Sequence, residues 1–260
     1  MSNAGPRCIT PSFPAAASVT TAEPTPLEQA LLRFRSHVDP GASAYAGPPS
    51  DLPAHWRDYL SQDADMRLAC LQGEMAVLGE YLPQAATAVR AGAEDAFLLT
   101  SPSTGLLRCV MRRQGDALYP TISAPPLGQT LPDNPAARLL LREGPEVLRW
   151  IQTTLMDGLT DMWGFGGPLR SARLTSMAAE IDTYAEADWF DAFSIDRDPS
   201  RVIEIFASGG GGYLLVDLDD PGLTGTDPQA LLVMMKEDAP PEPVPLYPWL
   251  DEWTAIAHSV

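Results

Sequence analysis

The spacing of apolar residues along the chain changes near residue 95 from a helical period to short strand-like runs. Between residues 64 and 91 the apolar side chains recur at helical spacing, and Gly79 and Pro83 are expected to break that helix. Strand-like runs follow at residues 96–100, 106–112 and 117–123, separated by glycine-containing turns. These runs and turns predict an antiparallel meander of about three strands.

Helix-start signals mark further elements on either side of this meander. Thr25 followed by Pro26 is typical of an N-cap and a first helical position, so a helix is predicted from there to a point before Pro40. A short helix is predicted over residues 53–62, with Trp56, Tyr59 and Leu60 pointing inward. Asn134–Pro135 predicts another helix start, and Gly144–Pro145 is expected to interrupt that helix before it continues to Leu155.

In the C-terminal half, two apolar runs flank four consecutive glycines, Gly209, Gly210, Gly211 and Gly212. Residues 202–206 and 213–218 are rich in β-branched and aromatic residues, so this stretch predicts a β-hairpin whose glycines form a structural turn. A phosphate-binding loop is disfavoured, because it requires Lys and Ser or Thr directly after the last glycine, at the start of a helix. Here Tyr213 and Leu214 lead into a strand.

The segments around the hairpin predict further short elements, and together they define the fold class. We expect a strand within 161–169, a short helix over 176–184, strands over 192–196 and 231–235, polyproline-like chain over 240–245 and a closing helix over 247–256. The whole pattern predicts an α+β fold, mainly an antiparallel sheet flanked by helices.

The order of the C-terminal elements resembles that of the SMI1/KNR4 family, also called the SUKH superfamily. The resemblance is carried by Ser208–Tyr213 at the glycine turn, Val216–Leu218 at the end of the second strand and Tyr247–Trp253 in the closing helix. Trp163–Gly167 is similar to the family's turn region, although the Asn of that turn is absent, and Ser176–Ile181 is similar to its short helix.

The resemblance implies an SMI1/KNR4-like α+β region over residues 136–260. A helical segment with the β-meander precedes it over residues 27–135. Residues 1–26 are rich in Pro, Ala, Ser and Thr, and we expect them to be a disordered leader. Many bacterial members of the family resemble immunity proteins encoded beside toxins, which makes neutralisation of a toxin the implied function.

The charge balance narrows the kind of partner. The 260-residue chain has 34 acidic and 17 basic side chains, for a net charge of −17. This charge argues against binding to duplex nucleic acid or to an anionic membrane, which both attract Lys and Arg. The acidic residues concentrate in residues 180–260, so a protein partner such as a basic toxin domain is favoured. Acidity that serves only solubility is the alternative.

The cysteines and the hydropathy bear on the compartment. Cys8, Cys70 and Cys109 are widely and irregularly spaced, which predicts neither a disulfide framework nor a zinc site and favours a reducing compartment. No apolar window has the length of a transmembrane helix, and the first residues lack the pattern of a secretory signal. We therefore expect a cytoplasmic protein that does not bind membranes.

No catalytic motif, metal site or cofactor site is predicted. The three histidines lie outside metal-binding patterns, and no nucleophile elbow occurs. Asp217, Asp219 and Asp220 are similar to part of a calcium loop, but the central glycine and distal Glu of such a loop are absent. A hydrolase whose carboxylates cluster only in three dimensions is the less favoured alternative.

Aromatic residues beside acidic ones are typical of protein interfaces, and core packing is the alternative for each aromatic residue. The candidate partner-binding residues are Trp163, Tyr184, Trp189, Tyr213, Asp217, Asp219, Asp220, Trp249 and Trp253. The sequence thus predicts a non-catalytic acidic binding protein, with a toxin as the favoured partner. A regulatory or scaffold protein that binds a cellular partner is the alternative.

Overall fold

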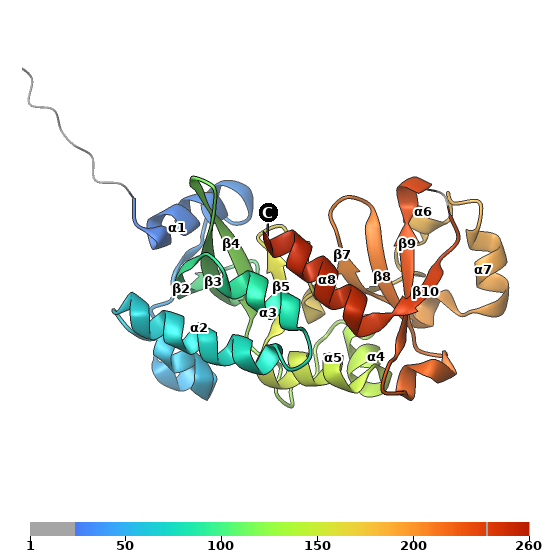
Figure 1. Cartoon of the computed structure of the whole chain (residues 1–260), viewed down its shortest axis with the longest axis horizontal. Coiled ribbons are helices and arrows are strands. Elements are labelled where there is room, and N and C mark those ends of the chain that lie inside the picture. The colour runs from blue at the N-terminus through green and yellow to red at the C-terminus, as the bar shows by residue number, and fades with distance from the viewer. Residues whose placement is uncertain (1–23, 238, 260) are drawn as a thin grey trace, which may run out of the picture.

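Two five-stranded antiparallel sheets with helices on their faces make up this α+β protein (Figure 1). The computed structural model describes residues 24–237 and 239–259. The strand orders are β1–β2–β3–β4–β5 and β10–β9–β8–β7–β6, so neighbours in the chain are neighbours in each sheet. The leader predicted over residues 1–26 lies, up to residue 23, outside the described residues.

The first sheet contains the predicted meander. Its strands are β1 (Ser43–Ala44), β2 (Ala93–Ser101), β3 (Gly105–Gln114), β4 (Ala117–Ala124) and β5 (Asp157–Asp161). Side chains alternate between two buried faces. Phe97 and Leu99 face α1 (Pro26–His37), while Ala96 and Leu98 belong to the core under α2 (Ala64–Leu78) and α3 (Pro83–Arg90). Burial on both faces explains why apolar residues follow one another in β2 and β3 instead of alternating with polar ones.

Local signals set the ends of the N-terminal helices as predicted. The Thr25 hydroxyl accepts a hydrogen bond from the Glu28 N–H at 3.3 Å, and Glu28 Oε2 accepts one from the Thr25 N–H at 2.8 Å. This reciprocal capping box satisfies N–H groups that the first turn of α1 leaves unpaired. The predicted break between α2 and α3 lies at Gly79 to Leu82, and Trp56 and Tyr59 are buried in the short helix η2 (Ala54–Leu60).

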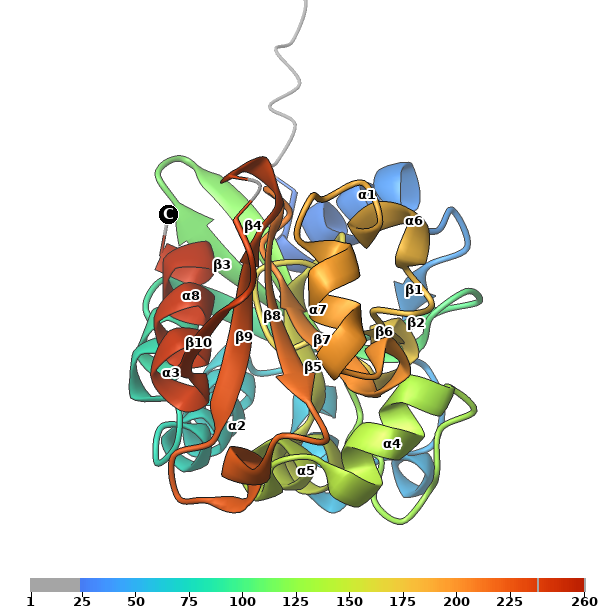
Figure 2. The same cartoon turned by 90° about the vertical axis from the view of Figure 1, so that its right-hand side faces the viewer.

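The second sheet is built on the predicted hairpin. Its strands are β6 (Thr175–Ser176), β7 (Val202–Ala207), β8 (Gly212–Asp217), β9 (Gln229–Met234) and β10 (Glu242–Pro245). One face, with Ile203 and Val216, belongs to the central core. The other, with Val202 and Leu215, packs under α6 (Ile181–Tyr184) and α7 (Phe190–Asp196). Figure 2 shows β7, β8 and β9 between α8 (Leu246–Ser259) on one side and α6 and α7 on the other.

Residues 165–169 join the two sheets. The Leu159 N–H of β5 donates to the Pro168 carbonyl at 2.9 Å, and the Leu169 N–H donates to the Ile205 carbonyl of β7 at 2.9 Å. This segment therefore lies between β5, an edge strand of the first sheet, and the part of β7 that the two-residue β6 does not cover, where it satisfies open backbone groups.

The closing helix α8 crosses from the second sheet back to the first and packs along α3 (Figure 1). One buried cluster includes Leu250 of α8, Val89 of α3, Val110 of β3 and Val216 of β8, so a single core extends between the sheets. The boundary expected at residue 135 does not follow the sheets, because β5 lies beyond it and completes the first one.

Helices and short turns complete the chain between the sheets. They are α4 (Pro135–Glu143), α5 (Glu146–Trp150), η1 (Pro49–Asp51), η3 (Ile151–Leu155), η4 (Ser171–Arg173), η5 (Pro199–Arg201), η6 (Pro221–Thr224) and η7 (Met235–Glu237). Asn134 caps α4, where its side-chain oxygen accepts from the Ala137 N–H at 3.2 Å, and the predicted interruption at Gly144–Pro145 separates α4 from α5.

Four local predictions in the C-terminal half were wrong. The strand predicted within residues 161–169 is limited to Asp161, the last residue of β5, and an isolated bridge between Pro168 and Phe206. Residues 192–196 are helical in α7, because Phe190 and Phe193 lie on one helical face that packs into the core. The helix predicted over 176–184 is instead β6 followed by the single turn of α6. Residues 242–245 pair with β9 rather than forming a free polyproline segment, and their position at the sheet edge tolerates Pro243 and Pro245.

Buried charges tie α2 to the first sheet. Arg108 of β3 is fully buried and forms an ion pair with Glu74 of α2, which is 6 % exposed. The rings of Trp56 and Tyr59 flank the guanidinium of Arg108, with centroids 5.6 and 5.7 Å from its central carbon. Because both charges are buried away from solvent, removing either residue would leave the other as an uncompensated buried charge.

Candidate protein-binding surface

The aspartates that follow β8 form one wall of a surface hollow. The hollow has a volume of about 420 Å³ and is lined by Asp196, Arg197, Asp198, Asp217, Asp219, Asp220 and Pro221; we call it the acidic hollow. It brings the end of α7 and the start of η5 against the loop between β8 and η6. Five carboxylates and one guanidinium line it, so its field favours a positively charged group.

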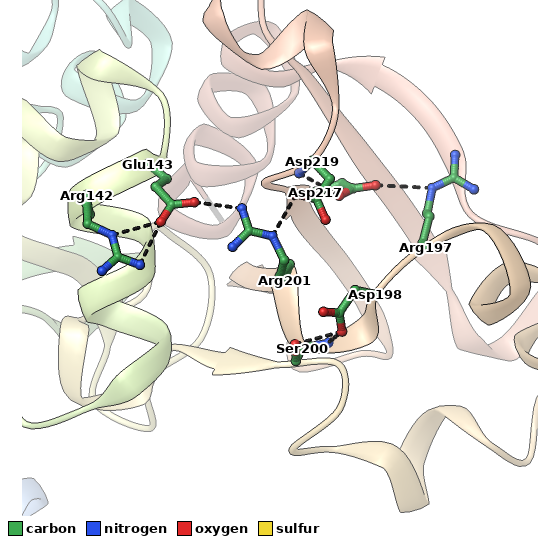
Figure 3. Close-up of polar contacts among 8 residues, drawn as sticks. All are labelled: Arg142, Glu143, Arg197, Asp198, Ser200, Arg201, Asp217 and Asp219. Carbon is green, nitrogen blue, oxygen red and sulfur yellow. Dashed lines mark hydrogen bonds and ion pairs between the residues drawn. The ribbon is translucent and has the colours of Figure 1, made fainter.

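Backbone hydrogen bonds fix the carboxylates of the acidic hollow. Asp217 Oδ1 accepts from the Asp219 N–H at 3.0 Å, and Asp220 Oδ1 accepts from the Gly222 N–H at 2.7 Å, where it caps η6. Asp198 Oδ1 accepts from the Ser200 N–H at 2.9 Å and caps η5 (Figure 3). These aspartates therefore occupy turns that their own side chains help to close.

Ion pairs connect the acidic hollow to α4. Arg201 donates to Glu143 Oε2 at 2.6 Å and to Asp219 Oδ1 at 2.7 Å, so it bridges α4 and the loop after β8 (Figure 3). Hydrogen bonds from Arg201, and next from Arg142, lower the pKa of the Glu143 carboxyl. On the other side, Arg197 lies 3.2 Å from Asp217 Oδ2. Asp217 is 8 % exposed, so its carboxylate is part of the wall of the hollow and presents little surface to a partner.

The predicted aromatic part of the interface does not form beside these aspartates. Tyr184 and Trp189 are 1 % and 7 % exposed and pack in the cluster under α6 and α7, so both were wrong as surface contacts. Trp249 and Trp253 of α8 pack against the central core and each other, with centroids 5.4 Å apart. Trp163 is 48 % exposed, but it lies in the turn after β5, near His37.

The four glycines form the turn between β7 and β8. Gly209 and Gly211 have φ angles of 74° and 93°, a region that favours glycine. The Ser208 hydroxyl accepts from the N–H groups of Gly210 and Gly212, at 3.1 and 3.0 Å. Gly212 then begins β8, so the turn is followed by a strand, and the N–H groups of Gly210 and Gly212 are used within the turn.

A second pocket contains a residue that the sequence analysis did not single out. Glu204 lies in the middle of β7, between apolar neighbours, and is only 9 % exposed. Its Oε2 accepts from the Tyr184 hydroxyl at 3.1 Å, and Tyr213, another predicted contact residue, lines the same pocket. The available signal was a carboxylate inside the apolar run VIEIFA, because buried carboxylates are rare and usually paired.

Within residues 24–237 and 239–259, no group of three or more His, Cys, Asp or Glu side chains is arranged to hold a metal ion. None of the helices in this described part combines the length and the apolar character that crossing a bilayer requires. Comparison of the chain with protein-family models, curated proteins and solved structures finds no match.

Proposed function

We propose that this chain is a non-catalytic binding protein that neutralises a bacterial toxin by covering a basic surface of the toxin. The observation that carries the proposal is the acidic hollow, in which five carboxylates and one guanidinium gather at the end of the hairpin. Opposite charge accelerates encounter with a basic surface and disfavours acidic partners. The resemblance to the SMI1/KNR4 family supports a toxin as that partner.

The surroundings of the acidic hollow suit a larger interface. Ile195, directly before Asp196, is 81 % exposed and offers an apolar contact beside the charges. Stable protein interfaces combine such apolar contacts with a polar rim. Because Asp198 and Asp220 are held by turn hydrogen bonds, they lose little freedom on binding. We propose the cytoplasm as the compartment, where the free thiols of Cys70 and Cys109 would remain reduced.

The proposal is tested by removing charge without removing the caps. In the first variant, Asp196, Asp198, Asp219 and Asp220 are each replaced by Asn, which also caps turns and helices. The matched control replaces four exposed carboxylates elsewhere, as Asp58→Asn, Asp65→Asn, Glu80→Gln and Asp116→Asn. Both variants change the net charge by the same amount, so a difference between them reports the place of the charge.

The partner for this experiment is the product of the gene beside the one that encodes this chain. We expect the wild type to bind it and suppress its toxicity, and the first variant to associate about ten- to a hundredfold more slowly at low salt. The control variant should bind as the wild type does. Equal losses in both variants, or a neighbouring product that is neither bound nor neutralised, would contradict the proposal. In the latter case a regulatory partner in the cell becomes the favoured alternative.

A further inference from the structure

The pocket that contains Glu204 lies apart from the acidic hollow. It has a volume of about 200 Å³ and opens between the turn after β5, the segment η4–β6, α6 and the β7–β8 hairpin. Glu204 and Glu180 contribute carboxylates, Phe165, Tyr184 and Tyr213 contribute rings, and Arg173 contributes a guanidinium. Glu204 is not among the residues that line the acidic hollow, so this pocket is separate from the surface of the proposed function.

Glu204 is a nearly buried carboxyl that lines this pocket. Its Oε2 accepts a hydrogen bond from the Tyr184 hydroxyl at 3.1 Å. No Arg or Lys of the described chain lies within ion-pair distance of it. A buried carboxylate without a cation beside it is costly, so the charged form of Glu204 is stabilised by a cation that enters the pocket.

Burial dominates the electrostatics around Glu204. Burial raises the pKa of the Glu204 carboxyl to about 7; the Tyr184 hydrogen bond opposes this rise, Glu180 adds to it and Arg173 opposes it. Tyr213 is the remaining titratable group of the pocket, and burial and then Glu204 raise its pKa. The carboxyl is therefore poised to lose its proton when a positive charge enters.

The walls of the pocket suit an ammonium group. The rings of Tyr184 and Tyr213 stand 6.2 Å apart at 66° to each other, and Phe165 lines the same space. Ring faces attract cations through their quadrupoles, and rings beside a carboxylate are a recurrent means of holding alkylammonium groups.

We infer that this pocket binds an alkylammonium group, with Glu204 as its counter-ion and the rings of Phe165, Tyr184 and Tyr213 as its walls. The group is carried either by a free small amine or by a lysine side chain of another protein. Arg173 is exposed, so it can swing toward solvent as the cation enters.

Proton release gives this inference a specific signature. Below pH 7 the cation must displace the proton from Glu204, whereas at pH 8 the carboxylate is already formed. The affinity for the amine should therefore be about tenfold lower at pH 6 than at pH 8. At pH 6, binding should also release the proton of Glu204 to the buffer. A simple surface ion pair would show no such change over this range.

The full chain is titrated with n-butylammonium and with Nα-acetyl-lysine methylamide, whose side-chain ammonium is free. Calorimetry and amide NMR measure the binding at pH 6 and at pH 8. Butanol and acetate are the neutral and anionic controls. We expect both amines to bind at pH 8, weakly and with shifts at Glu204 and Tyr213. The tighter of the two names the source of the ammonium group: a free amine or a lysine side chain.

Variants separate the pocket from general acidity. Glu204→Gln should abolish binding and its pH dependence, and Tyr213→Leu should weaken binding several-fold while leaving the carboxyl in place. Asp219→Asn removes one carboxylate from the acidic hollow and should bind amines as the wild type does. If Glu204→Gln does not fold, as judged by circular dichroism, Tyr213→Leu and the pH profile of the wild type carry the test. Absence of binding by both amines, preference for acetate, or an equal loss in Asp219→Asn would overturn the inference.

Discussion

Asp251 Oδ1 in α8 accepts a hydrogen bond from the backbone N–H of Ala85 in α3, at 2.8 Å and across 166 residues of sequence. Its Oδ2 accepts from the Gln84 N–H at 3.1 Å. Leu82, the residue before α3, supplies no side-chain cap, so the closing helix provides the cap for a helix in the other half of the chain. The same carboxylate is 4 % exposed, which makes it part of the contact between the two halves.

Replacing Asp251 by Ala should therefore destabilise the whole fold rather than one helix. Loss of an N-cap costs about 1–2 kcal/mol, and the buried N–H of Ala85 loses its acceptor. Urea unfolding followed by circular dichroism measures the change in free energy. Glu252→Ala, at an exposed neighbouring position, is the control and should leave the midpoint nearly unchanged. Equal effects of the two substitutions would show that Asp251 is no cap.

The pair Arg108–Glu74 should be intolerant of losing one member. Glu74→Ala leaves a fully buried guanidinium without its counter-ion, which costs about 3–5 kcal/mol of unfolding free energy. The double variant Glu74→Leu/Arg108→Met should recover most of that stability, because apolar side chains of similar size remove both charges.

The exposed pair Arg113–Glu94 supplies the control for this series. Its side chains are 48 % and 33 % exposed, so Glu94→Ala should cost less than about 1 kcal/mol. Thermal and urea unfolding of all three variants decide the matter. A small loss in Glu74→Ala, comparable to that of Glu94→Ala, would contradict the role assigned to the buried pair.

His258 should make stability depend on pH. Burial, and then the Arg112 guanidinium, lower the pKa of His258 from 6.5 to about 3. Between pH 3 and pH 6.5 the unfolded chain carries a proton on His258 that the folded chain does not. The contribution of His258 to stability is therefore full above pH 6.5 and falls toward pH 3. The slope from this residue is about 1.4 kcal/mol per pH unit.

The measurement compares wild type with His258→Asn, since Glu204 acts in the opposite direction. The raised pKa of Glu204 means that the folded state keeps a proton that the unfolded chain loses between pH 4.5 and 7. The contribution of Glu204 to stability therefore falls as the pH rises. The difference between the two unfolding curves isolates His258. His37→Asn, at an exposed position, is the control. A difference that does not change with pH would refute the prediction.

Gly167 should tolerate no side chain. A Cβ there would collide with the backbone carbonyl oxygen of Leu159, within the segment that joins the two sheets. Overpacking of this kind costs about 1–3 kcal/mol or more, because backbone must move. Gly73→Ala in α2 meets no atom within 4 Å and should instead stabilise the chain by about 1 kcal/mol. Differential scanning calorimetry should therefore show shifts of opposite sign, and a neutral Gly167→Ala would contradict the packing described here.

The outcomes of the sequence predictions differ by the range of the interactions involved. The glycine turn, the meander and the capped start of α1 were predicted because each depends on residues close together in sequence. Residues 192–196 were assigned the wrong structure, because a run of this length suits either a strand or a helix until its packing is known. The aromatic surface failed similarly: nothing local distinguishes Tyr184, which is buried, from Trp163, which is exposed.

By itself, the sequence determined the α+β class, the hairpin and the concentration of aspartates after its second strand, since backbone preference and charge are properties of neighbouring residues. Only the tertiary structure decided that Asp196 at the end of α7 lines the same hollow as Asp219 and Asp220, or that Glu204 meets Tyr184. Those encounters depend on how strands pair and helices pack across long stretches of chain. The free energy of such packing is shared among many residues, and no local pattern records it.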